Sequence, residues 1–186
     1  KFDGQALMFL VHSDIRVALV TDHVPVKDIA MYITADRIES KLKSVVHSLQ
    51  QDFGITNPRV AVLGLYPHSG EQGVIGKEEI NTLVPLLQNL DVEKAEINGP
   101  FSADAFFGLK SYKNYDAILA MYHDQGLIPF KTLSFGQGVN FTAGLSVVRT
   151  SPDHGTAFAI AGKGEADPES FAQAVQAAIE IVERRT

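Results

Sequence analysis

The chain has 186 residues, of which 45% are hydrophobic and 20% charged, with a formal net charge of -6 and no cysteine. This length suits one sizeable α/β domain and is too short for two comfortable ones. The negative charge and the lack of a Lys/Arg cluster argue against nucleic acid or an anionic membrane as a partner, and no stretch is long and apolar enough to span a membrane. Without cysteine there are no disulfides or thiolate ligands, a composition that fits a cytoplasmic enzyme.

The first third of the chain already contains both strand and helix patterns. Residues 5–12 and 16–21 are apolar runs separated by a short polar turn, which favours an antiparallel pair. Because the chain starts directly in strand-like sequence, we expect it to be a fragment whose partner half is missing. Residues 35–53 carry apolar side chains at helical spacing, with Thr34 as the N-cap and Gly54 at the end.

The alternation of strands and helices continues to the carboxyl terminus. Strands are expected at residues 59–65, 97–101, 117–121 and 139–149, the last broken by Gly144. Helices are expected at residues 77–90, at residues 103–107 and after Pro168. The side chains expected to face inward from the first of these helices are those of Ile80, Leu83, Val84 and Leu87. The last helix carries one apolar stripe, formed by Phe171, Val175, Ile179 and Val182. This alternation predicts an α/β fold, a layered sheet with flanking helices.

Three of the predicted strands are each followed by a histidine. The runs at 16–21, 59–65 and 117–121 lead to His23, His68 and His123. If these strands are parallel, the three imidazoles lie at one edge of the sheet, where open α/β sheets bind ligands. Three imidazoles with an open position are the ligands of a catalytic divalent metal, whereas three separately hydrogen-bonded histidines are the alternative.

Residues 115–131 contain further polar candidates near the third histidine. Asp124 comes directly after that histidine, and Lys131 follows within reach of the same edge. Lys131 and Arg149 stand among uncharged residues, so they form either a small basic pocket for an anionic substrate or part of the ordinary surface. Asp104 lies in the first turn of a predicted helix, where it either complements the helix dipole or orients a metal-bound histidine.

Five segments together resemble one enzyme family. They are YDAILAMYHDQGLIPFK (115–131), GVNFTAGLSVVRTSPDHGTAFAIAGKG (138–164), DHVPVKDI (22–29), PHSGEQG (67–73) and GPFSADAFF (99–107). These segments are similar to those of the 4-hydroxythreonine-4-phosphate dehydrogenase family of pyridoxal phosphate biosynthesis. The resemblance implies an isocitrate/isopropylmalate dehydrogenase-like fold with two α/β domains, and a homodimer in which both subunits contribute to each active site. Family members are longer at the amino end, so residues 1–186 are expected to be the carboxyl-terminal portion, with the first domain largely missing.

The resemblance also implies roles for individual residues. The metal ligands would be His23, His68 and His123. The substrate contacts would be Lys131, Asn140 and Arg149, with Asp104 and Asp124 as acidic neighbours. Residues 154–164 resemble the adenosine-binding loop of decarboxylating dehydrogenases, which places NAD or NADP beside His154, Gly155, Thr156 and Gly162.

The implied reaction is the oxidation, with decarboxylation, of the small phosphorylated hydroxy acid 4-phosphohydroxy-L-threonine. It would use one divalent ion such as zinc, cobalt, manganese or magnesium, and either Asp124 or Lys131 would move the proton. The chain departs from the family pattern at Tyr66, Gln72, Ser146 and Ala159. Because Tyr66 is bulky and close to a ligand, a sibling dehydrogenase acting on threonate or erythronate 4-phosphate, or on a cis-diol, is an alternative.

Two further alternatives lie outside the dehydrogenases. Three histidines that activate water would make a metallohydrolase, which predicts no NAD binding. A carboxyl-terminal fragment that is inactive on its own would be a non-catalytic metal-binding or dimerisation module. An intact dimer with no turnover would support the non-catalytic module.

Overall fold

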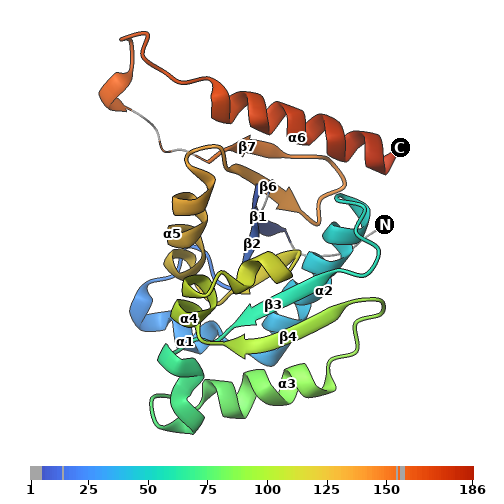
Figure 1. The fold of residues 1–186 in the computed structure, drawn as a ribbon, viewed down its shortest axis with the longest axis vertical. Helices are drawn as coiled ribbons and strands as arrows, with labels where there is room; N and C mark the ends of the chain where they lie inside the picture. Colours follow the sequence, from blue (N-terminus) through green and yellow to red (C-terminus); the bar gives the residue numbers. More distant parts are fainter. Residues whose placement is uncertain (1–5, 14, 154, 156–157) are drawn as a thin grey trace.

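The described part of the chain forms one mixed seven-stranded sheet in the order β4-β3-β5-β2-β1-β6-β7 (Figure 1). The computed structural model describes residues 6–13, 15–153, 155 and 158–186. The strands are β1 Leu7–His12, β2 Ile15–Leu19, β3 Arg59–Leu63, β4 Glu96–Phe101, β5 Ala117–Ala120, β6 Val139–Ala143 and β7 Thr150–Pro152. The short strand β7 falls where the sequence patterns predict none.

The sheet has a parallel half and an antiparallel half. Strands β4, β3, β5 and β2 run parallel to one another. Strand β1 is antiparallel to both β2 and β6, and β6 is antiparallel to β7. The antiparallel pair predicted at the start of the chain is therefore confirmed, with Phe9 opposite Ala18.

Helices cover both faces of the sheet, so the α/β layered architecture predicted from the alternation is confirmed (Figure 1). The helices are α1 Ile29–Tyr32, α2 Ala35–Gln51, α3 Val84–Asn89, α4 Ala103–Gly108, α5 His123–Ser134 and α6 Glu169–Arg185. On β2, Ala18 packs with the α2 face while Val17 and Leu19 pack with α4 and α5, because successive strand residues point to opposite faces. Both faces are buried, which explains the continuous apolar runs of the parallel strands.

Local chemistry determines where α2 begins and ends. The hydroxyl of Thr34 accepts a hydrogen bond from the backbone N–H of Arg37 at 3.4 Å, and Gly54 follows with φ of +70°. Both features match the predicted cap and stop signals. The helix runs from Ala35 to Gln51, slightly shorter than expected, and its buried residues include Leu42.

The predicted helix at residues 77–90 is built differently. It starts as a π-helical turn, Glu79–Leu83, and continues as α3 with Pro85 in its first turn, where the missing N–H does not interrupt the hydrogen-bond ladder. The wider π turn rotates the apolar pattern, so that Leu83 is fully buried but Ile80 is 46% exposed. The inward orientation expected for Ile80 is wrong.

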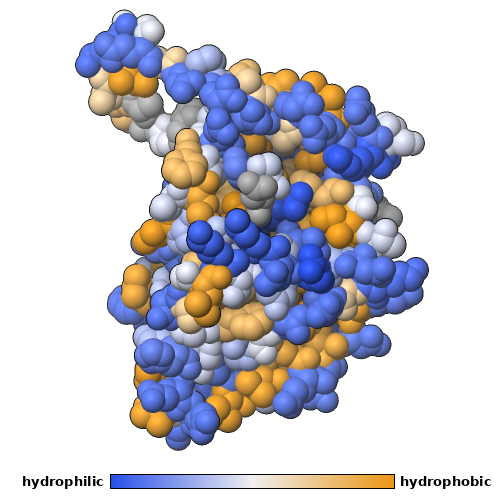
Figure 2. All heavy atoms as spheres, in the orientation of Figure 1, coloured by the Kyte–Doolittle hydropathy of each residue, from blue (hydrophilic) through white to orange (hydrophobic). Residues whose placement is uncertain are grey.

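Helix α6 lies along β6 and β7 (Figure 1). Its inner face is formed by small and apolar side chains, among them Ala174 and Ile181, and its end is tied down by the ion pair from Arg185 Nε to the buried Asp52 carboxylate at 2.7 Å. The predicted apolar stripe of this helix faces solvent, with exposed fractions between 45% and 63%. Figure 2 shows apolar residues interrupting the hydrophilic surface in this region. None of the described helices has both the length and the apolar composition needed to cross a membrane.

Candidate metal and substrate site

The three histidine-bearing segments leave the sheet at one edge. Strand β5 lies between β2 and β3, and all three are parallel, so their carboxyl ends point the same way. The three strands that precede the histidines are therefore parallel, as the sequence argument for a shared site required. How close the side chains come depends on the segments that follow each strand.

His23 and His123 lie side by side at this edge, with ring centroids 5.8 Å apart. Two imidazoles that bind one ion at about 2.1 Å have ring centroids about 5 to 6 Å apart, so the pair fits a shared metal. The Asp22 carboxylate accepts the His23 backbone N–H at 2.9 Å. Burial acts to raise the pKa of Asp22, but this hydrogen bond and neighbouring positive charge hold it below its ordinary value, so the carboxylate that bonds the His23 backbone stays ionised.

His123 is the first residue of α5, and the next residue fixes its ring. The Nδ1 atom of His123 lies 2.7 Å from Oδ1 of Asp124. A carboxylate on one ring nitrogen selects the tautomer that leaves the other nitrogen free to bind a metal. Asp124 therefore makes an orienting contact to a histidine ring, and the orienting role expected for Asp104 stays a prediction.

His68 follows β3 on the 3-10 segment Pro67–Gly73 and is exposed. Its charge acts on Asp104, one of the causes that lower the pKa of that carboxyl. Among the described residues, no group of three His, Cys, Asp or Glu side chains is arranged to hold a metal ion. Within one chain, then, the geometry provides two adjacent imidazoles and not the three expected.

Gln125 ties the strand ends together, a role that no sequence signal assigned to it. Its side-chain oxygen accepts the Met121 N–H at 2.7 Å, and its side-chain nitrogen donates to the Gly64 carbonyl at 2.7 Å. One amide therefore joins the ends of β5 and β3. The signal that could have pointed to it is its place two residues after a strand-end histidine.

Asp104 and Asp124 both line a cavity of about 460 Å³ between α4 and α5. The pKa of Asp104 is lowered chiefly by the Ser102 hydroxyl, which donates to its carboxylate at 2.6 Å, and then by the Ala105 backbone N–H. Ser102 occupies the expected N-cap position but its side chain makes no cap hydrogen bond to the helix backbone. The lining of the cavity is largely apolar, and one of its polar residues, Asp124, contacts His123.

The predicted substrate contacts occupy a second region, around α5 and β6. Lys131 Nζ pairs with Asp153 Oδ1 at 3.2 Å. Asn140 lies on β6 and its side-chain oxygen is buried without a hydrogen-bond partner among the described residues. Arg149 is exposed and donates to the Thr142 hydroxyl at 2.8 Å.

Part of the predicted cofactor loop can be located. His154 and Thr156 lie outside the described residues, whereas Gly155 and Gly162 are exposed. Gly162 has φ of +75°, a conformation that favours glycine. A cavity of about 380 Å³ lies beside the same segment, lined by residues that include Asp153 and Ile160.

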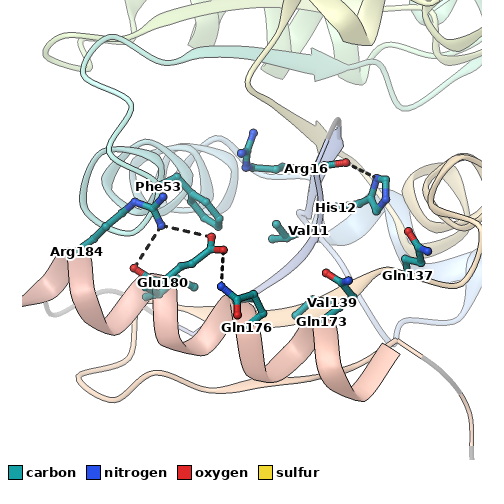
Figure 3. A pocket seen from close by; sticks show the side chains of 13 residues that line it. Val11, His12, Arg16, Phe53, Gln137, Val139, Gln173, Gln176, Glu180 and Arg184 are labelled. Atoms are coloured by element: carbon teal, nitrogen blue, oxygen red, sulfur yellow. Dashed lines mark hydrogen bonds and ion pairs between the residues drawn. The ribbon is translucent and has the colours of Figure 1, made fainter. Parts of the chain in front are cut away.

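Another cavity, of about 430 Å³, lies between α6 and the β1–β2 pair (Figure 3). The Arg16 guanidinium lies 4.8 Å from the centre of the Phe53 ring, and its Nε is buried without a partner among the described residues. Burial lowers the pKa of Arg16. Arg184, on α6, lines the same cavity and forms an ion pair with Glu180. None of the predicted site residues lines this cavity, so it is separate from the histidine edge.

Comparisons with known proteins agree with this architecture. The sequence model of the family described as pyridoxal phosphate biosynthetic protein PdxA matches residues 1–178. A curated 4-hydroxythreonine-4-phosphate dehydrogenase of Bacteroides thetaiotaomicron is 51% identical over 182 residues, covering 98% of this chain and 50% of the relative. A solved 4-hydroxythreonine-4-phosphate dehydrogenase from Klebsiella pneumoniae superposes with a TM-score of 0.82 at 39% identity, covering 95% of this chain and 54% of that one. A solved terephthalate 1,2-cis-dihydrodiol dehydrogenase from Burkholderia xenovorans gives 0.74 at 29% identity, covering 94% and 55%.

The sheet and its solved neighbours define the class of protein first: this is an α/β chain of dehydrogenase-like fold. Within that class, the chain belongs to the pyridoxal phosphate biosynthetic protein PdxA family. It spans about half the length of the curated relatives that it matches. The family resemblance and the fold class expected from the motifs are both confirmed.

Proposed function

We propose that this chain carries the metal-binding part of a cytoplasmic NAD-dependent dehydrogenase that oxidises and decarboxylates 4-phosphohydroxy-L-threonine. The observation that carries the proposal is the pairing of His23 with His123, 5.8 Å apart, with Asp124 on the Nδ1 atom of the second ring. This pairing supports a metal-ligand arrangement over two separately satisfied histidines, because the carboxylate on Nδ1 of His123 leaves the other nitrogen of that ring for a ligand. The names of the matched relatives supply the substrate.

The residues that would hold a divalent ion are His23 and His123, joined by His68 from a second copy of the chain. His68 is exposed, and within one chain the described residues form no group of three metal ligands, so a homodimer that shares its active sites would complete a three-imidazole set. Nitrogen ligands suit zinc or cobalt, and manganese or magnesium if carboxylate or water joins them. A bound ion supplies a Lewis acid that stabilises negative charge on the hydroxyl oxygen being oxidised.

The substrate anion would be held at the other end of α5. Lys131 follows His123 by eight residues on the same helix, which corresponds to about 12 Å of helical rise. Its long side chain can span part of that distance. A phosphorylated hydroxy acid can therefore place its hydroxyl near the imidazoles and its phosphate near Lys131. Arg149 would bind the same anion, and the unpaired side-chain oxygen of Asn140 would accept a hydrogen bond from the substrate.

Asp124 and Lys131 would have different roles in this proposal. Asp124 is already engaged with His123 Nδ1 and acts by orienting that ring. Lys131 lies on the same helix and exchanges its partner Asp153 for the substrate when the substrate binds.

The nicotinamide cofactor would lie beside residues 154–164. The cavity at this segment is lined by three carboxylates, those of Asp153, Asp167 and Glu169, and by no Lys or Arg among the described residues. A ribose hydroxyl can donate to a carboxylate, whereas a 2′-phosphate would be repelled. The lining therefore favours NAD over NADP.

A second candidate function is a sibling dehydrogenase that acts on a cis-diol or on threonate or erythronate 4-phosphate. The observation that favours it is the similarity to the terephthalate cis-dihydrodiol dehydrogenase, at a TM-score of 0.74. Tyr66, the departure that raised this alternative, directs its hydroxyl to Glu78 at 3.2 Å. Its ring is thus held within its own loop, which weakens the sequence argument for a different substrate.

The test combines metal analysis with NAD titration, before and after chelation, followed by turnover assays on a substrate panel. Binding of both, with oxidation of 4-phosphohydroxy-L-threonine ahead of the other acids and the cis-diol, is the expected result. Turnover of another panel member first would favour the sibling dehydrogenase. Metal without NAD would favour the metallohydrolase, and a metal-bound dimer without turnover the non-catalytic module.

A further inference from the structure

The segment that carries His68 has an unusual backbone. Five successive residues, from His68 to Gln72, have φ between 44° and 77°, and only Gly70 among them is glycine. Residues with a Cβ adopt this left-handed conformation at a steric cost, so a run of them persists only where the surroundings determine it. What holds this loop therefore decides where His68 points.

Glu79 is the buried group that holds the start of the loop. Its side chain is almost fully buried, and its Oε1 atom accepts the backbone N–H groups of Leu65 and Tyr66, each at 2.8 Å. These two residues connect the end of β3 to the His68 segment. A single carboxylate oxygen thus satisfies both donors at the point where the chain leaves the sheet.

The other oxygen of Glu79 lies against the middle of the same loop. Its Oε2 atom is buried without a hydrogen-bond partner among the described residues. A Cβ placed on Gly70 would lie 2.6 Å from this atom, so a side chain at Gly70 would displace the carboxylate. Glu79 therefore touches both the entry and the turn of the loop.

Two weaker contacts close the loop at its sides. The Tyr66 ring packs directly on Gly76, and its hydroxyl donates to Glu78. The Ser69 hydroxyl donates to the Pro100 carbonyl at 3.2 Å, which ties the residue after His68 to β4. Both contacts lie nearer the surface than Glu79, so the buried carboxylate is the central support.

We propose that Glu79 is a positioning residue: its buried carboxylate holds the loop at residues 65, 66 and 70, and so keeps residues 68–72 in the left-handed conformation that presents His68 for metal binding. The part of this inference that concerns metal rests on the proposed function. The part that concerns the loop rests on the two hydrogen bonds and the close contact with Gly70. Glu79 touches neither a metal nor a substrate, and it acts through the backbone of the loop.

Two substitutions of Glu79 separate the effect of its hydrogen-bond acceptor from the effect of its side-chain size. Glu79→Met keeps the length of the side chain but leaves the Leu65 and Tyr66 N–H groups buried without an acceptor. Glu79→Gln keeps a carbonyl oxygen that can accept both. Glu71→Met is the matched control, because Glu71 is an exposed carboxylate in the same loop.

Loop position is read by the rate of tryptic cleavage after the exposed Lys77, and metal binding by calorimetric titration with zinc, both on the whole chain with its fold checked by circular dichroism. Glu79→Met is expected to be cleaved faster and to bind zinc about 10- to 100-fold more weakly, the effect typical of residues that support metal ligands. Glu79→Gln and Glu71→Met are expected to behave like the parent.

The result that overturns the proposal is a folded Glu79→Met chain with parental cleavage at Lys77. A Glu79→Gln chain cleaved as fast as Glu79→Met would also overturn it, because acceptance of the two N–H groups would not be the cause. If the parent binds no zinc, the proposed function fails, but the cleavage rates still decide whether Glu79 holds the loop.

Discussion

The two regions that carry the predicted site residues are built in different ways. At the histidine edge, the segments after three parallel strands are held by side-chain hydrogen bonds. The side chains that make these bonds are those of Asp22, Asp124, Gln125 and Glu79. Around β7 and residues 158–168, the described residues are largely exposed and are joined by few side-chain hydrogen bonds. The first region therefore holds its polar side chains in place through its own hydrogen bonds, whereas the second has fewer such contacts among the described residues.

The largest expected effect is at the histidine pair. His123→Ala removes one of the two adjacent imidazoles, and zinc affinity should fall by more than about 100-fold, since loss of a supporting residue alone costs about 10- to 100-fold. Equilibrium dialysis with metal analysis measures it. His12→Ala is the control, because His12 lies outside the histidine edge, on β1. Retained stoichiometric metal in the His123→Ala chain would disprove the assignment.

The attachment of α6 depends on one buried ion pair. Arg185→Met leaves the Asp52 carboxylate, 2% exposed, with Ser48 as its remaining side-chain partner, and the free energy of unfolding should fall by about 3 kcal/mol. Arg184→Met, which removes an exposed pair with Glu180, should change it by less than about 0.5 kcal/mol. Urea unfolding compares the two, and equal effects would mean that the buried pair does not anchor the helix.

The orienting carboxylate at His123 should have an intermediate effect. Asp124→Asn keeps the shape of the side chain but removes the charge that polarises the imidazole, so metal affinity should fall by about 10-fold or more while the fold is unchanged. Calorimetric titration measures the affinity. Asp104→Asn serves as the comparison, and a larger loss there would return the orienting role to Asp104.

The smallest expected effect concerns the pH range over which the Tyr66–Glu78 hydrogen bond stabilises the His68 loop. Burial, and then the Glu78 carboxylate, raise the pKa of the Tyr66 phenol above its ordinary value of 10.0. The stability from this hydrogen bond is therefore fully present below pH 10 and is lost as the pH rises through the higher folded pKa. Tryptic cleavage after Lys77 should accelerate only above pH 10, and Tyr66→Phe should abolish that pH dependence.

Local patterns predicted much of the parallel half of the sheet. The apolar runs leading to the three histidines became β2, β3 and β5, and the caps of α2 matched Thr34 and Gly54. These features depend on side-chain period and backbone preference within a few residues. The inward orientation predicted for Ile80 was wrong because the π turn before Pro85 changes the spacing of the apolar side chains. Strand β7 was missed because a three-residue strand is specified mainly by its partner strand.

By itself, the sequence determined the strand and helix segments, the family, and the placing of a histidine after each of three strands, because these follow from short-range pattern and motif. Only the tertiary structure decided that His23 meets His123, that Asp124 bonds the ring of His123, and that Lys131 pairs with Asp153. It also decided that Glu79 is buried. The physical reason is that most of these contacts join residues distant in the chain, and the bond from Asp124 depends on how α5 begins at the sheet edge, so strand order and helix placement set the distances.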